Sequence, residues 1–191
     1  MRRLAALALL VLTLVAACMP HASRALDLPH AEPDGISVTL VLHGDVEFTP
    51  DERADVERAA KAWFDMSSGR VAVLPAWDLD FADVASLRRV GLGSAIVRAS
   101  SDTAIARQVD EELGAKTLAI TTKPLLRVSV WMDRVERSDF YAVVLHELGH
   151  VAGLEHTGKR KGDVMSPVFE RGATAFSPRD LALCKAAALC P

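Results

Sequence analysis

The chain has 191 residues, half of them hydrophobic and a quarter charged, which is the balance of a globular protein with a real core. This length predicts one domain with a short appendage. The formal net charge is −3, and no predicted face concentrates Lys or Arg, so the composition excludes a nucleic-acid partner. Nothing in the sequence indicates more than a monomer.

The amino terminus has the pattern of an export signal. Residues 1–3 are a basic start, and residues 4–16 are an apolar run that is shorter than the roughly 20 residues of a membrane span. Residues 15–18, Val-Ala-Ala-Cys, resemble a bacterial lipobox. This predicts residues 1–17 as a lipoprotein signal peptide and Cys18 as the acylated residue, the only membrane contact of a cell-envelope lipoprotein. An ordinary signal peptide, cut a few residues later, is the alternative and also exports the protein to the periplasm or the outside.

Residues 18–35 are rich in Pro and Ala and predict a tether, and residues 36–191 predict the folded domain. A helix begins after Thr49, with Pro50 in its first turn and Glu52 at its third position, and it ends near Gly69. A weaker helical pattern covers residues 102–113. Runs of β-branched and apolar residues predict five strands, at residues 36–42, 70–74, 91–99, 117–122 and 128–132.

Three acidic residues, Asp78, Asp80 and Asp83, follow the second predicted strand. A calcium loop needs a denser run of oxygen ligands and a glycine turn. We therefore interpret this region as a solvated acidic loop and expect no calcium.

The segment that carries chemistry is residues 146–156, His-Glu-Leu-Gly-His-Val-Ala-Gly-Leu-Glu-His. His146 and His150 are four residues apart, so on a helix they project from one face and can bind one metal ion. Glu147 can reach a metal-bound water without being a ligand. Gly153 can adopt the positive φ that ends a helix, which would return His156 as a third ligand. Three protein ligands leave the fourth position of a tetrahedral zinc open, as in catalytic sites.

The start and the surroundings of this helix can also be predicted. Ser138 is in position to cap it, and the carboxylate of Asp139 would complement the positive end of its dipole. Further along, Ser177 and Pro178 begin a last helix. Cys184 and Cys190 can pair if that helix ends near Ala188 and the tail folds back, whereas two free thiols are the alternative.

The extended motif resembles that of the metzincin metalloproteases, which are named for a methionine turn beyond the third histidine. Met165 lies nine residues after His156, and with Thr157 and Pro167 the pattern is most similar to the matrixin branch. The resemblance implies an α+β, metzincin-like zincin fold: a mixed twisted sheet, an active-site helix, and a carboxyl-terminal helix after the methionine turn. It also implies that residues 117–122 form an edge strand above the zinc. The cysteine-switch motif of matrixin propeptides is missing from the sequence, and this leaves the restraint of activity open.

The function that this resemblance implies is hydrolysis of peptide bonds by an exported zinc endopeptidase. His146, His150 and His156 would hold one Zn²⁺, Glu147 would be the general base, and Met165 would form an apolar floor beneath the histidines. Pro167 would stiffen the wall of the substrate pocket. Two alternatives stay open at this point: a zinc-binding module without proteolytic activity, and another zinc hydrolase such as an amidase or an exopeptidase.

Overall fold

The computed structural model of the chain describes residues 36–80, 94–123, 126–158 and 161–191, all of which belong to the unit Gly35–Pro191. The predicted signal peptide, Cys18 and the tether lie outside these residues, as does Asp83. None of the described helices has the length and the apolar character that crossing a membrane requires.

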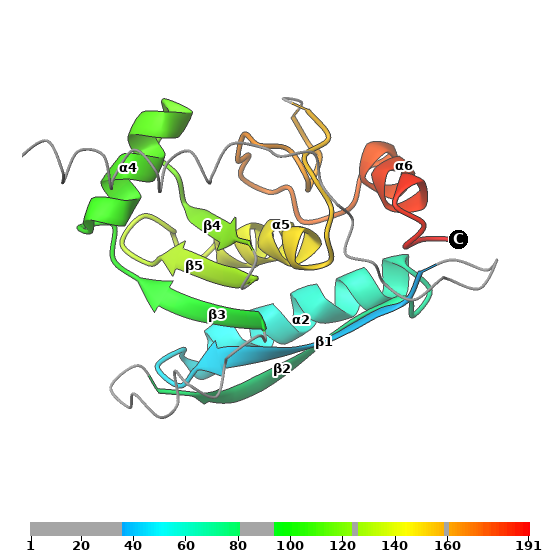
Figure 1. The fold of residues 1–191 in the computed structure, drawn as a ribbon, viewed down its shortest axis with the longest axis horizontal. Coiled ribbons are helices and arrows are strands. Elements are labelled where there is room, and N and C mark those ends of the chain that lie inside the picture. Colours follow the sequence, from blue (N-terminus) through cyan, green and yellow to red (C-terminus); the bar gives the residue numbers. More distant parts are fainter. Residues whose placement is uncertain (1–35, 81–93, 124–125, 159–160) are drawn as a thin grey trace, which may run out of the picture. The chain divides into compact units, whose positions relative to one another are not determined.

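A mixed five-stranded sheet is the centre of the domain (Figure 1), with the strand order β2-β1-β3-β5-β4. Four strands are parallel neighbours: β1 (Val38–Asp45), β2 (Val71–Leu79), β3 (Ser94–Ala99) and β5 (Arg127–Trp131). The short strand β4 (Ala119–Thr122) is antiparallel to β5 and lies at the edge of the sheet. The expected position of this strand at an edge is therefore what the structure shows.

Strand β2 is longer than the sequence predicted. It continues through Pro75 and Trp77 to Leu79, although the prediction ended at residue 74. Proline has no N–H group to donate to a neighbouring strand. It is tolerated here because β2 is an edge strand of the sheet, which has a neighbouring strand on one side only. Asp78, which we had assigned to an acidic loop, lies within β2, and its carboxylate is 2.9 Å from Nδ1 of His43 on the neighbouring strand.

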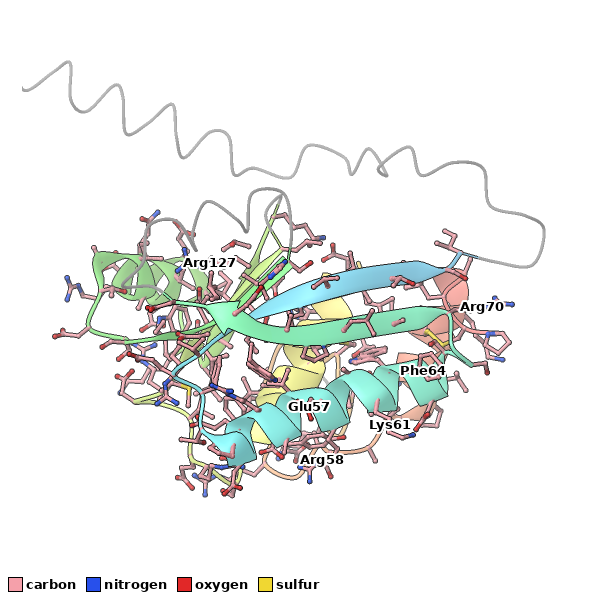
Figure 2. The ribbon with its side chains drawn as sticks, turned by 90° about the horizontal axis from the view of Figure 1, so that it is seen from below. Glu57, Arg58, Lys61, Phe64, Arg70 and Arg127 are labelled. Carbon is pink, nitrogen blue, oxygen red and sulfur yellow. A yellow bond between two sulfur atoms is a disulfide. The ribbon has the colours of Figure 1, made fainter. Side chains whose placement is uncertain are left out.

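Helices α2 (Pro50–Met66) and α5 (Phe140–Val151) pack against each other, and α2 also packs on β2. Helix α2 begins as predicted, with a capping box in which Thr49 and Glu52 satisfy each other's backbone N–H groups. Arg58 and Lys61 lie on the side of α2 that faces away from the sheet (Figure 2), and both side chains are exposed. The other helices of the described residues are α4 (Ala104–Leu113) and α6 (Pro178–Ala186).

The core joins α2 to α5 through Trp63. Its side chain is fully buried, and its indole Nε1 donates a hydrogen bond of 2.8 Å to the backbone carbonyl oxygen of Leu145. Phe48 and Phe140 are also buried, with their ring centroids 5.8 Å apart. Helix α5 is therefore held in place from the side that faces α2, which fixes the helix carrying the candidate ligands.

The predicted cap at Ser138 is wrong. The N-cap of α5 is Asp139, and its side chain makes no capping hydrogen bond. Residues 136–139 form a turn in which the backbone N–H of Asp139 donates to the carbonyl oxygen of Glu136, so Asp139 already has helical dihedral angles. A capping side chain needs an extended backbone, and the carboxylate of Asp139 instead lies 3.3 Å from Nε of Arg171.

The carboxyl terminus is closed by a disulfide between Cys184 and Cys190, whose Cα atoms are 5.3 Å apart. Helix α6 ends at Ala186, and Ala188 has a φ of 58°, so the tail turns back as the pairing requires. The carbonyl oxygen of Ala188 accepts a hydrogen bond of 3.0 Å from the backbone N–H of Ile36. The start and the end of the described domain therefore lie side by side.

Candidate metal centre

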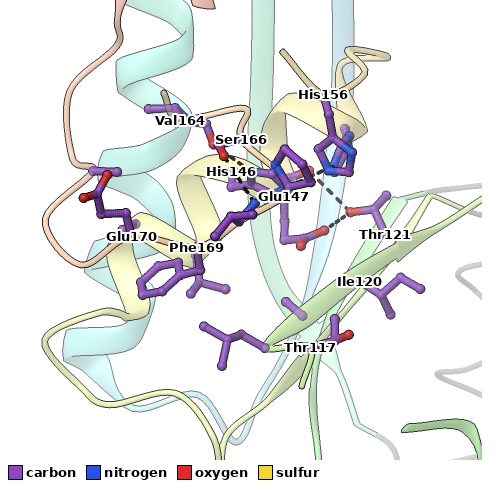
Figure 3. A pocket seen from close by; sticks show the side chains of 18 of the residues that line it. Thr117, Ile120, Thr121, His146, Glu147, His156, Val164, Ser166, Phe169 and Glu170 are labelled. Carbon is purple, nitrogen blue, oxygen red and sulfur yellow. Dashed lines mark hydrogen bonds between the residues drawn. The ribbon is translucent and has the colours of Figure 1, made fainter. Parts of the chain in front are cut away.

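Three histidines meet at the carboxyl-terminal half of α5 (Figure 3). His146 and His150 project from one face of the helix, and His156 approaches them from the segment that follows it. The nitrogen atoms available as ligands all lie within 4.8 Å of one another, and among the described residues no other group of acidic, histidine or cysteine side chains has this arrangement. The structure therefore brings together the three residues that the motif predicted as ligands.

The turn that returns His156 is a Schellman motif at the end of α5. The backbone N–H of Leu154 donates to the carbonyl oxygen of Gly149, and that of Gly153 donates to His150. Gly153 has a φ of 94°, a value that strains any residue with a Cβ. Since the carbonyl oxygen of Leu154 in turn lies 2.8 Å from Nδ1 of His150, the same turn also orients a ligand.

The protonation of the rings follows from their backbone contacts. Nδ1 of His146 faces the carbonyl oxygen of Val164 at 2.6 Å, as Nδ1 of His150 faces that of Leu154. A carbonyl oxygen only accepts, so each Nδ1 carries the proton, and each Nε2 of the neutral ring has a free lone pair. Nε2 of His150 is 3.1 Å from Nε2 of His146 and 3.2 Å from Nε2 of His156. The lone pairs of His146 and His150 repel each other at this distance unless a cation lies between them.

These separations fit a zinc ion. Zn–N bonds of about 2.0–2.1 Å at tetrahedral angles place two ligand nitrogens about 3.4 Å apart. Burial lowers the pKa of His146 to about 4, and burial is also the main cause that lowers the pKa of His150 and of His156. All three imidazoles are therefore neutral at pH 7, which is the form that binds a metal ion.

Glu147 lies beside the three histidines and is 5% exposed. Burial raises the pKa of its carboxyl group to about 7, and a hydrogen bond from Thr121 acts weakly in the opposite direction. The Thr121 hydroxyl on β4 lies 2.5 Å from Oε2 of Glu147 (Figure 3). Sequence reasoning missed this contact, because it joins two residues that are 26 positions apart and lie on different elements.

Met165, the residue of the predicted methionine turn, is fully buried. It packs against Gly149 on the underside of α5, where an added Cβ would lie 2.9 Å from Cε of Met165 and 2.8 Å from Cζ2 of Trp63. Only a glycine allows this close approach. The backbone N–H of Thr157 donates to the carbonyl oxygen of Met165, so the turn also holds the segment next to His156.

Asp180 on α6 holds the methionine turn from the other side. Its carboxylate is fully buried and accepts hydrogen bonds from the backbone N–H groups of Val164 and Met165, each at 2.9 Å, and from that of Ser177 at 2.8 Å. The carbonyl oxygen of Val164 is the partner of His146, so Asp180 supports a ligand through one peptide unit. The sequence shows Asp180 only as part of a capping box, and nothing in its local pattern indicates the longer reach.

A cleft with a volume of about 780 Å³ opens beside the histidines. Its lining includes β4 with the residues before it and the segment after Met165, which contains Pro167 and Phe169. Half of the lining residues are apolar, and the others are polar or charged. Lys123 and Glu155 also line the cleft, and they form an ion pair at 2.9 Å, in which Glu155 is exposed.

The other predicted site residues lie elsewhere. Cys184 and Cys190 are in the carboxyl-terminal tail, bonded to each other, and take no part in the histidine cluster. Cys18 lies outside the described residues. The roles assigned to the site residues, and the limits of the three segments at residues 1–17, 18–35 and 36–191, stay predictions.

Comparison with known proteins agrees with the site. No curated protein matches the chain. The family model described as matrixin matches residues 28–183, which is most of the chain. This match confirms the resemblance seen in the sequence and the α+β metzincin-like fold expected from it. The chain therefore belongs to the matrixin family of metallopeptidases.

Proposed function

We propose that this protein is an exported zinc endopeptidase that hydrolyses internal peptide bonds of a protein or peptide substrate. The observation that carries the proposal is the convergence of three neutral imidazole nitrogens, with the Glu147 carboxylate beside them, in the lining of one cleft. A zinc ion held by His146, His150 and His156 would supply a Lewis acid that acidifies water and polarises a carbonyl group.

Glu147 moves the proton in this proposal. Its carboxylate accepts a proton from the attacking water and then delivers it to the nitrogen of the leaving amine. A pKa near 7 suits both steps at neutral pH, because the group exchanges a proton easily in either direction. Met165, Gly149 and Asp180 take no part in the chemistry; they keep the helix and the turn at a fixed separation.

The edge strand β4 would hold the substrate. Its outer side has backbone groups that no neighbouring strand of the sheet pairs, and the strand lines the cleft. An extended peptide can add there as another strand through main-chain hydrogen bonds. The side chain next to the cleaved bond would enter the apolar space between Val143 and Pro167. The protein would thus bind the main chain of many substrates and select one side chain.

The test compares the parent protein with Glu147→Gln on casein and on a peptide library. We expect the parent to cut internal bonds, a chelator to stop it, and the variant to keep its zinc while losing at least a hundredfold in kcat, which is typical of a lost general base. Glu111→Gln, which removes an exposed glutamate of α4 outside the cleft, is the matched control and should retain activity. A zinc-loaded parent that cuts nothing would indicate a binding module, and cuts at chain ends only would indicate an exopeptidase.

We also propose that the protein is a monomeric lipoprotein of a bacterial cell envelope. The support is the lipobox-like sequence that ends at Cys18. Labelling with a radioactive fatty acid should mark the parent in the membrane fraction. The variant Cys18→Ala should carry no label, and equal labelling of both would contradict the proposal.

A further inference from the structure

The inner face of β4 carries one polar group toward the catalytic helix. Side chains alternate along a strand, so Ala119 and Thr121 share a face, whereas Thr122 points to the other. Ala119 is buried, Thr121 is half-buried and Thr122 is exposed. Strand β4 lies next to α5, and the close view shows the Thr121 hydroxyl directed at Glu147 (Figure 3).

The distances indicate which acceptor receives the hydrogen bond of the Thr121 hydroxyl. Its Oγ1 is 2.5 Å from Oε2 of Glu147 and 3.4 Å from the backbone carbonyl oxygen of the same residue. A short contact to a carboxylate is the stronger hydrogen bond, since the acceptor carries charge. Among the described residues, Thr121 is the one hydrogen-bond donor to this carboxylate.

The hydrogen bond between Thr121 and Glu147 matters because the two side chains differ in flexibility. A glutamate has three rotatable bonds, so holding it in one conformation costs side-chain entropy. Threonine is β-branched, and on a strand it has a restricted χ1. The hydroxyl therefore reaches the carboxylate from a rigid element, and a carboxylate held by one oxygen keeps the other for a second partner.

We propose that Thr121 is a positioning residue for the base: its hydroxyl holds Oε2 of Glu147 and leaves Oε1 to accept the proton of the attacking water. This inference rests on the proposed function. It assigns to the edge strand a second role beside substrate binding. A correctly placed base acts in the chemical step and not in substrate binding, so the effect of Thr121 should be on kcat.

The experiment uses the full zinc-loaded protein with a peptide that the parent cleaves. Thr121→Val keeps the shape of the side chain and removes the donor, and we expect kcat to fall about tenfold while KM stays within about twofold. Thr121→Ser restores the hydroxyl and should recover most of kcat. Thr39→Val is the matched control: it makes the same change at an exposed strand position, on β1 and outside the cleft, and should leave kcat unchanged.

Two further measurements separate positioning from damage to the fold. Zinc content and the urea midpoint should be equal in the parent and in Thr121→Val. A crystal structure of zinc-loaded Thr121→Val should show the Glu147 carboxylate displaced or in several conformers. An unchanged carboxylate, an unchanged kcat, or a Thr121→Ser variant as slow as Thr121→Val would overturn the inference. If the parent cleaves no peptide, the proposed function fails, and the crystal structure still decides whether Thr121 positions Glu147.

Discussion

Asp180 gives the sharpest test of how the metal centre is supported. The change Asp180→Asn keeps the size of the side chain but replaces one carboxylate oxygen with an NH₂ group, which cannot accept a hydrogen bond. In the parent protein, three backbone N–H groups donate hydrogen bonds to the fully buried carboxylate of Asp180. An amide has one acceptor oxygen, so at least one of these donors loses its partner and faces another donor.

The expected loss in the free energy of unfolding follows from these three hydrogen bonds. Losing one hydrogen bond to a charged group costs about 1.5–3 kcal/mol, and making the other two neutral roughly halves each, for about 1 kcal/mol apiece. We therefore expect Asp180→Asn to lower the free energy of unfolding by about 3–5 kcal/mol, a large share of the stability of a small domain. Because the carbonyl oxygen of Val164 orients His146, zinc affinity should also fall, by about tenfold or more.

Urea unfolding followed by tryptophan fluorescence, with chelator and with zinc, measures both effects. Arg179→Gln is the control: the Arg179 side chain is half exposed and forms an ion pair with Asp163 at 3.2 Å, so the loss should be below about 1 kcal/mol. If Asp180→Asn unfolds at the same urea concentration as the parent and binds zinc equally well, the carboxylate does not hold the methionine turn and the reasoning is refuted.

Two more predictions follow from Gly149 and Glu147. Gly149→Ala should lower the free energy of unfolding by about 1–2 kcal/mol, because overpacking against Met165 and Trp63 exceeds the gain in helix propensity; an equal or higher urea midpoint would contradict this. Burial raises the pKa of Glu147 from 4.5 to about 7, so the folded state keeps a proton that the unfolded state releases between these values, and the metal-free protein loses about 3 kcal/mol as the pH rises through this window. Metal-free Glu147→Gln lacks this loss, so in urea unfolding it should exceed the parent in stability by about 3 kcal/mol at pH 8 and by little at pH 4.5. The same advantage at both pH values would show that the ionisation of Glu147 is not its cause.

The histidine cluster could be predicted from the sequence because all its parts are local. His146 and His150 share a helix face by periodicity, and the positive φ of Gly153 follows from its place after the helix. The helix starts at Thr49 and Ser177 are local for the same reason and lie where the sequence placed them.

The supporting contacts could not be predicted in this way. Thr121 and Glu147 lie 26 residues apart, and Asp180 reaches Met165 across 15 residues, so each contact depends on how separate elements pack. The error at Ser138 has a related cause: a turn before α5 gives Asp139 a helical backbone, which no single-residue preference reveals. The extension of β2 through Pro75 required knowing that this strand is an edge.

The hydrogen bond between Ile36 and Ala188 has a practical consequence for engineering. A domain whose two ends meet can be inserted into an exposed loop of a host protein without stretching either partner. It can also be circularly permuted by a short linker between the ends, with new termini opened in a surface turn. The Cys184–Cys190 bridge lies at this junction, so such a fusion is best produced where disulfides form.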